Sequence, residues 1–170
     1  MPDAYDVAIQ TELDGRKMYL DAARRAGDRL ARSMFEALAG DELRHLQLIK
    51  KASKRDVPAE DAAPGTPEIR DLKRGIQTVF SLAGCKLSDR VVVSATDTEA
   101  IRIAMEFETR GHRFYQEHAR KTMDKDQKRL FQELALWESE HLSLLQNLML
   151  YFEDAESWYA WQEQHLSDGG

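Results

Sequence analysis

The sequence predicts an all-α domain, a bundle of four long helices in which one long crossover joins the second helix to the third. Three observations predict this fold. The 170 residues are rich in helix formers such as Ala, Leu, Glu, Arg and Lys. Apolar residues recur at helical spacing in four segments. Three of the four prolines, Pro58, Pro64 and Pro67, lie in one stretch that separates the first two segments from the last two.

The first half of the chain predicts a helical hairpin. Helical periodicity runs from about Tyr5 to Ala26, and Gly27 and Asp28 then suit a stop. A second helix is predicted from about Arg29 to Ser53. Because the connection between these helices is so short, they must be antiparallel neighbours.

Residues from about 54 to 95 are expected to form the crossover. Asp56 to Thr66 holds the prolines and is the clearest linker of the chain. Apolar residues between Ile69 and Phe80 predict a short amphipathic helix before Gly84, and Val91 to Val93 are suited to cover an edge of the core. The crossover returns the chain along the bundle before the third helix begins.

The second half predicts another helical hairpin. Thr96 followed by Glu99 matches a capping box, which opens a third helix over about residues 97–122. A fourth helix is expected from about Asp124 to Phe152.

The predicted bundle occupies residues 1–152. The aromatic segment 153–170, with Trp158, Tyr159 and Trp161, is expected to pack on the bundle or on a partner subunit. A homodimer is therefore the expected assembly.

Composition narrows the possible partners and location. The net charge of -6 arises from interspersed acids and bases without a Lys/Arg cluster, which excludes nucleic acid, and no apolar run is long enough to cross a membrane. The start of the chain lacks the features of a signal peptide, so a cytoplasmic location is expected. Cys85, the only cysteine, cannot supply a rubredoxin-type iron site, so any electrons consumed must come from a separate donor.

Two Glu-x-x-His motifs, at Glu42/His45 and Glu138/His141, lie in the second and fourth predicted helices. Spacing of i, i+3 projects both side chains from one helix face. Each motif alone is weak, because such pairs arise by chance in a chain of this composition.

An internal repeat with an offset of 96 residues strengthens the interpretation. It pairs Glu12 with Glu108, Gly15 with Gly111, Tyr19 with Tyr115, Phe35 with Phe131, Leu38 with Leu134, Glu42 with Glu138, and His45 with His141. Each half thus offers one Glu in its first helix and Glu-x-x-His in its second. Tyr19 and Tyr115 lie two turns after their glutamates and should share the inward face. Duplicated hairpins that face each other would form one shared site.

The residue types at this site predict metal binding. Four inward carboxylates would repel one another strongly and be costly to bury. Two divalent cations remove the repulsion, and two ferrous ions would balance the four carboxylates while neutral imidazoles add nitrogen ligands. The predicted metal ligands are Glu12, Glu42, His45, Glu108, Glu138 and His141.

This pattern resembles the rubrerythrins and other ferritin-like diiron-carboxylate proteins, over most of the chain. The resemblance implies two iron ions, with Glu12 and Glu108 as terminal ligands and Glu42 and Glu138 as bridging ligands. It implies one histidine per metal, and that Tyr19 and Tyr115 hydrogen-bond the ligand carboxylates.

Two departures from the rubrerythrin pattern stand out. No Cys-x-x-Cys pair of a rubredoxin-like domain accompanies the bundle, so a stand-alone ferritin-like domain is expected. Where many rubrerythrins place a further carboxylate, one turn after the third-helix ligand, this chain has Gly111. His112 and His118 are interpreted as surface or interhelical residues rather than ligands.

The resemblance favours a cytoplasmic diiron peroxidase that acts against oxidative stress, reducing hydrogen peroxide with electrons from an external donor protein. A ferroxidase for iron storage or detoxification that uses oxygen is an alternative with the same ligands. A dimanganese or mixed-metal centre is another, since oxygen and imidazole ligands also suit manganese. The non-enzymatic alternative is a metal-binding scaffold.

Overall fold

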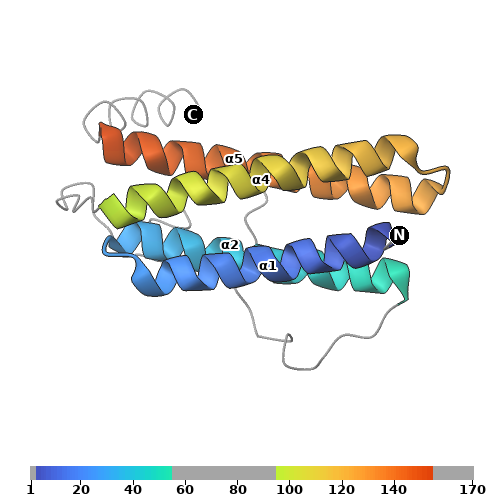
Figure 1. Cartoon of the computed structure of the whole chain (residues 1–170), viewed down its shortest axis with the longest axis horizontal. Helices are drawn as coiled ribbons and strands as arrows, with labels where there is room; N and C mark the ends of the chain where they lie inside the picture. Colours follow the sequence, from blue (N-terminus) through green and yellow to red (C-terminus); the bar gives the residue numbers. More distant parts are fainter. Residues whose placement is uncertain (1–2, 55–94, 155–170) are drawn as a thin grey trace, which may run out of the picture.

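Four helices make up almost all of the chain that the structure describes, which is residues 3–54 and 95–154 of a computed structural model. They are α1 (Ala4–Arg25), α2 (Arg29–Ser53), α4 (Ala95–Lys121) and α5 (Lys125–Glu153), and these two ranges contain no strand (Figure 1). The all-α four-helix bundle predicted from the sequence is therefore confirmed.

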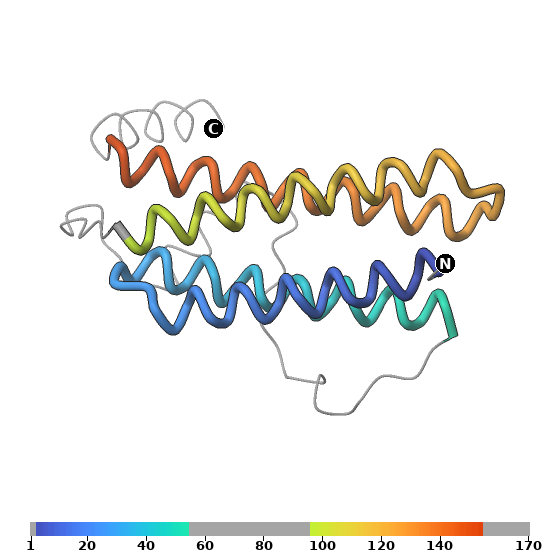
Figure 2. The backbone as a smooth tube through the Cα atoms, in the orientation of Figure 1, coloured from blue at the N-terminus to red at the C-terminus, as the bar shows by residue number. Residues whose placement is uncertain are grey.

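The helices form two antiparallel hairpins, α1 with α2 and α4 with α5, as the backbone trace shows (Figure 2). The hairpins lie against each other with α1 next to α4 and α2 next to α5. The end of α2 and the beginning of α4 lie at opposite ends of the bundle (Figure 1). This is the arrangement for which the sequence predicts a long crossover.

An aspartate caps the second helix of each hairpin. The side chain of Asp28 accepts hydrogen bonds from the backbone N–H groups of Leu30 and Ala31, and Asp124 accepts from Asp126 and Gln127. These bonds satisfy N–H groups that have no partner within the helix. Asp28 and Asp124 are 96 positions apart, so the cap belongs to the internal repeat as well.

The core consists of two apolar clusters on either side of a polar layer. One cluster includes Tyr19, Phe35 and Leu144, and the other includes Tyr115, Phe131 and Leu134. The buried charged residues near the middle of the helices lie between them. The two clusters hold the four helices together on both sides of the candidate site.

A buried aspartate of α4 joins the two hairpins at one end of the bundle. Asp97 accepts hydrogen bonds from the backbone N–H groups of Gly27 and Asp28, at 3.0 and 3.1 Å. These residues form the connection between α1 and α2. The contact fixes where the second hairpin meets the first.

The helix ends agree with the sequence to within one or two residues, which is the usual scatter of helix ends. The predicted capping box is an exception. Helix α4 already includes Ala95 and Thr96, so Thr96 lies inside the first turn rather than before it. A Thr-x-x-Glu pattern is compatible both with a capping box and with an exposed first turn of a helix. The sequence alone does not distinguish these two positions.

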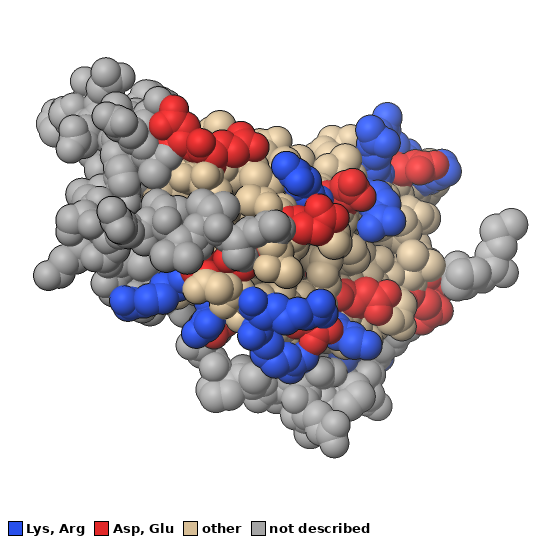
Figure 3. All heavy atoms as spheres, turned by 60° about the vertical axis from the view of Figure 1, so that its left-hand side comes forward, with Lys and Arg blue, Asp and Glu red and all other residues tan. Residues whose placement is uncertain are grey.

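Several predictions concern parts of the chain outside the described residues. They are the crossover with its linker and short helix, Cys85, and the aromatic segment after Asp154. Tyr151 and Phe152, by contrast, are described and are buried in the apolar cluster around Phe35. The face that Figure 3 shows carries both acidic and basic side chains, in small groups that lie next to one another. No helix in the described ranges is long and apolar enough to span a membrane.

Candidate metal centre

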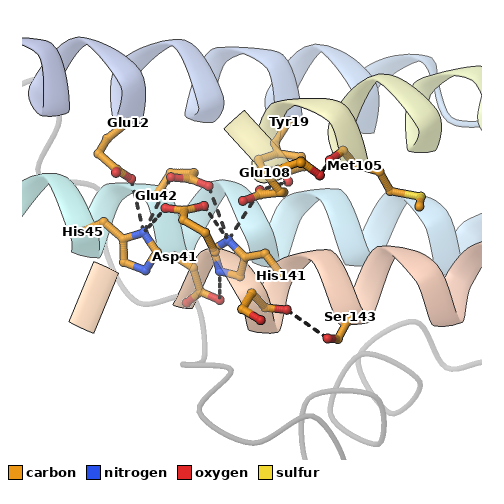
Figure 4. A network of polar contacts seen from close by, with 12 residues as sticks. Glu12, Tyr19, Asp41, Glu42, His45, Met105, Glu108, His141 and Ser143 are labelled. Carbon is orange, nitrogen blue, oxygen red and sulfur yellow. Dashed lines mark hydrogen bonds and ion pairs between the residues drawn. The ribbon is translucent and has the colours of Figure 1, made fainter. Parts of the chain in front are cut away.

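All four helices contribute to one buried polar centre. Helices α1 and α4 contribute one glutamate each, and α2 and α5 each contribute a glutamate and a histidine one turn apart (Figure 4). No residue of this set is more than 4% exposed. The set is Glu12, Glu42, His45, Glu108, Glu138 and His141. The structure thus brings together all six ligands that the sequence predicts.

The six residues divide into two overlapping groups whose ligand atoms lie within 4.8 Å of one another. One group adds Glu12 and His45 to a shared pair of glutamates, and the other adds Glu108 and His141 to the same pair. The shared residues are Glu42 and Glu138. A carboxylate has two oxygens, so a shared glutamate can bridge two cations held by the two groups.

Both histidines direct the same ring nitrogen at the carboxylates. Nδ1 of His45 lies 3.2 Å from Oε2 of Glu12 and 3.6 Å from Oε2 of Glu42. Nδ1 of His141 lies 3.5 Å from Oε1 of Glu42 and 3.5 Å from Oε1 of Glu108. The two rings are stacked, with centroids 5.2 Å apart. Nδ1 is therefore the nitrogen that each ring can offer to a metal ion.

Two buried tyrosines connect the hairpins by reciprocal hydrogen bonds. The hydroxyl of Tyr19 in α1 donates to Glu108 in α4, and the hydroxyl of Tyr115 in α4 donates to Glu12 in α1. Burial raises the pKa of both tyrosines well above the usual value, and the charges of these glutamates add to the effect. Each hydroxyl therefore keeps its proton and can orient a carboxylate.

Glycines at equivalent positions leave room beside the two shared glutamates. A Cβ atom at Gly15 would lie 3.3 Å from Cδ of Glu42 and 2.8 Å from Cε1 of Phe107. A Cβ atom at Gly111 would lie 3.6 Å from Cδ of Glu138. Gly111, the position where many rubrerythrins place a further carboxylate, thus borders Glu138 directly.

The sequence of the whole bundle matches the family model of rubrerythrin, over residues 3–149. The chain belongs to the rubrerythrin family. Comparisons with curated proteins and with solved structures gave no match. Rubrerythrin-family proteins typically bind iron, and this member carries the buried carboxylate and histidine groups of a diiron-carboxylate protein.

The rubrerythrin-type site fits cations because it leaves buried polar atoms unsatisfied. Within the described ranges, Oε1 of Glu42, Oε2 of Glu108 and Nδ1 of His141 have no hydrogen-bond partner. Such atoms are costly to bury without a partner. Oxygen and imidazole donors that converge on one point suit divalent iron or manganese.

Burial is the largest influence on the carboxyl groups of the site. It raises the pKa of Glu12 to about 8, and the charge of Glu42 adds to this effect. It also raises the pKa of Glu138 well above the usual value, together with the charges of Glu108 and Glu42. Burial acts in the same direction on Glu42, but the close approach of Glu12 and of both histidines to its carboxylate outweighs it, so the pKa of Glu42 is lowered.

The two histidines are affected in the opposite sense. Burial alone would lower their pKa values, but Glu12 beside His45 and Glu108 beside His141 hold both values well above the usual range. The site therefore retains protons on carboxyl and imidazole groups. A metal ion must displace them, because it binds the deprotonated ligands.

The other two histidines of the described ranges lie outside the centre, as the sequence analysis expects. Nδ1 of His112 is 2.7 Å from the carbonyl oxygen of Ala135. The ring of His118 packs on Phe114 and Phe131. Neither belongs to a group of candidate ligands.

Two residues that the sequence pattern does not single out contact the histidines from outside. Asp41 lies 3.6 Å from Nε2 of His141, and Trp137 stacks on the ring of His45. They occupy equivalent positions of the repeat, each one residue before a shared glutamate. The only indication in the sequence is that Asp41 stands directly before a candidate ligand glutamate. Its partner, His141, lies on another helix and could be found only from the structure.

Proposed function

We propose that this protein is a peroxidase in which two iron ions, held by the six residues of the centre, reduce hydrogen peroxide with electrons from an external donor. The observation that carries the proposal is the pair of overlapping ligand groups, which share Glu42 and Glu138. Such a pair would hold two metal ions, each able to donate one electron. Bound iron would supply the redox chemistry, one electron from each ion.

The electron count is compatible with peroxide as the oxidant. Peroxide needs two electrons and two protons to give two molecules of water, and two ferrous ions provide that number of electrons. Oxygen can take the same two electrons to give hydrogen peroxide, which is the balance of the ferroxidase alternative. The buried position of the centre restricts it to a small oxidant, since no candidate ligand residue is more than 4% exposed.

The protein's own groups have defined tasks in this proposal. Glu12 and Glu108 would each hold one of the two cations, and each is oriented by a tyrosine hydroxyl from the other hairpin. Tyr19 and Tyr115 keep a proton next to these carboxylates, where it can support proton delivery. The surrounding apolar clusters exclude water from the centre.

The test is anaerobic loading with Fe(II), followed by rapid mixing with peroxide or with oxygen. We expect two irons per chain and a rise in diferric absorbance that is much faster with peroxide. A faster reaction with oxygen, with turnover of added Fe(II), would instead identify a ferroxidase. If the protein instead retained manganese in preference to iron, the centre would be assigned as a manganese site.

A pair of histidine variants supplies the matched control. His141→Ala should lose one of the two ions, because His141 belongs to only one ligand group, while His112→Ala should retain both, because His112 contacts a backbone carbonyl outside the centre. Failure of the unsubstituted protein to bind two metal ions would reject the proposed function.

A further inference from the structure

The two ligand histidines differ in what lies behind them. Each ring faces the carboxylates with Nδ1, and its other side contacts a residue of the opposite hairpin. For His141 this residue is Asp41, and for His45 it is Trp137. Asp41 and Trp137 are 96 positions apart, so the repeat that conserves the ligands between the two halves places unlike residues here.

Asp41 is buried and directed at His141. Its Oδ2 atom has no hydrogen-bond partner within the described ranges and lies 3.6 Å from Nε2 of His141 (Figure 4). Its Oδ1 atom is paired with Arg44, one turn later on α2. The ion pair offsets the charge of the buried carboxylate and fixes its orientation.

Trp137 gives His45 a different environment. The two rings are nearly parallel, with centroids 4.8 Å apart and an interplanar angle of 9°. Stacking holds the imidazole plane but offers no anion to it. Among the described residues, the ion pairs of His45 all involve Nδ1, and none involves Nε2.

The different neighbours of His141 and His45 should give the two metal positions different affinities, because the ring N–H opposite the metal can hydrogen-bond to an anion. When Nδ1 of a neutral imidazole binds a metal, the ring proton must be on Nε2. At His141 that N–H points at Asp41, and a movement of a few tenths of an ångström makes a hydrogen bond. A carboxylate in this position fixes the ring and makes it a stronger donor to the metal.

We propose that Asp41 positions and polarises His141, so that the metal position beside His141 binds its cation first and more tightly than the position beside His45. This inference rests on the proposed function, because it presupposes two metal positions. Asp41 is a positioning residue that acts through His141.

The experiment is a titration of the metal-free, full-length protein with Co(II), monitored by visible absorption and by the hyperfine-shifted ring N–H resonances. Two binding steps are expected. The first should produce one exchangeable histidine resonance, which persists in His45→Ala and is lost in His141→Ala. The resonance of His45 should appear only with the second equivalent.

Asp41→Asn tests the cause of the difference. Arg44 would hold the amide oxygen, which turns the amide N–H₂ group toward Nε2–H of His141. We expect the affinity of the first step to fall by about 10- to 100-fold and its resonance to shift. The second step should change far less. In a His141→Ala background, Asp41→Asn should have no further effect on affinity.

Trp137→Phe is the matched control, because it keeps an aromatic ring on His45 and should leave the first step unchanged. Equal affinities in the unsubstituted protein, or a first cation beside His45, would overturn this inference and leave the proposed function standing. Neither reading depends on Asp41→Asn, so both hold even if that variant fails to fold. Binding of fewer than two cations by the unsubstituted protein would instead reject the proposed function itself.

Discussion

The two helical hairpins have the same ligands at the same spacing but differ in the residues that touch those ligands. In α1–α2 and in α4–α5, a glutamate is followed 30 residues later by Glu-x-x-His. The neighbours diverge, since Asp41 corresponds to Trp137, and the tightly packed Gly15 corresponds to the less crowded Gly111. The repeat thus preserves the pattern of candidate ligands, while the surrounding contacts make the two halves unequal.

The contacts between the hairpins also show that neither half forms a site alone. Glu42 from the first hairpin and Glu138 from the second belong to both ligand groups. The tyrosine of each hairpin orients the glutamate of the other. Changes to shared residues should therefore affect both metal positions, and changes to unshared residues only one.

The largest expected effect is loss of metal when a shared ligand is removed. Glu138→Ala should abolish binding at both positions, while Glu108→Ala should leave one ion, because Glu108 belongs to only one ligand group. Metal analysis after gel filtration gives the number of ions per chain. Retention of two tightly bound ions by Glu138→Ala would show that the ligand assignment is wrong.

The next effect concerns stability and pH in the metal-free protein. The pKa of Glu12 is about 8 in the folded chain against a usual value of 4.5, so between these values the folded state holds a proton that the unfolded state has released. Stability must then fall as the pH rises through this window. The raised pKa values of both histidines act in the same direction, with stability lost as the pH rises through their folded values.

We expect the free energy of unfolding of the metal-free protein to drop by roughly a few kcal/mol between about pH 5 and pH 8. Metal affinity should rise over the same range, because binding displaces these protons. Urea denaturation with and without bound metal measures both trends. If the metal-free protein instead became more stable toward pH 8, the protons assigned to Glu12 and to the two histidines would be wrong.

A smaller effect is expected from the tyrosines that join the hairpins. Tyr19→Phe and Tyr115→Phe each remove a buried hydrogen bond to a carboxylate, which should reduce stability by about 1–3 kcal/mol. The two losses should be similar, since each ring also stacks on an equivalent phenylalanine, Phe35 or Phe131. Chemical denaturation of both variants compares them, and a loss confined to one variant would disprove the reciprocity.

The smallest effect separates the two glycines. Alanine in a helix interior is favoured over glycine by about 0.5–1 kcal/mol. Gly111→Ala should realise this gain, because the new Cβ atom meets only ordinary contacts, 3.6 Å or more away. Gly15→Ala should lose it, because the Cβ atom would lie 2.8 Å from the ring of Phe107. In thermal denaturation, Gly111→Ala should have a higher melting temperature than Gly15→Ala. Equal or reversed melting temperatures would count against the difference in packing around the two glycines.

The sequence predicted the helices and the grouping of the six candidate ligands because both depend on periodicity. Helical spacing places Glu42 and His45 on one face, and the repeat supplies the matching face in the second half. The family assignment follows from the same pattern and is confirmed. Metal binding by these residues stays a prediction.

Contacts that depend on how helices face each other could not be predicted in this way. The sequence suggested that Tyr19 and Tyr115 contact carboxylates, but the crossing of each hydroxyl to the opposite hairpin depends on the packing of α1 on α4. The role of Asp41 depends equally on the packing of α2 on α5, since its partner His141 is 100 positions away. Periodicity orients a side chain within its own helix but does not identify the residue opposite.

The most direct test of the two-metal centre is anomalous diffraction at the iron absorption edge, from crystals of the iron-loaded protein. The structure predicts two peaks per chain, one beside Nδ1 of His45 and one beside Nδ1 of His141, with Glu42 and Glu138 shared between them. A single peak, no peak, or iron bound only elsewhere on the chain would contradict a centre built jointly by the two hairpins.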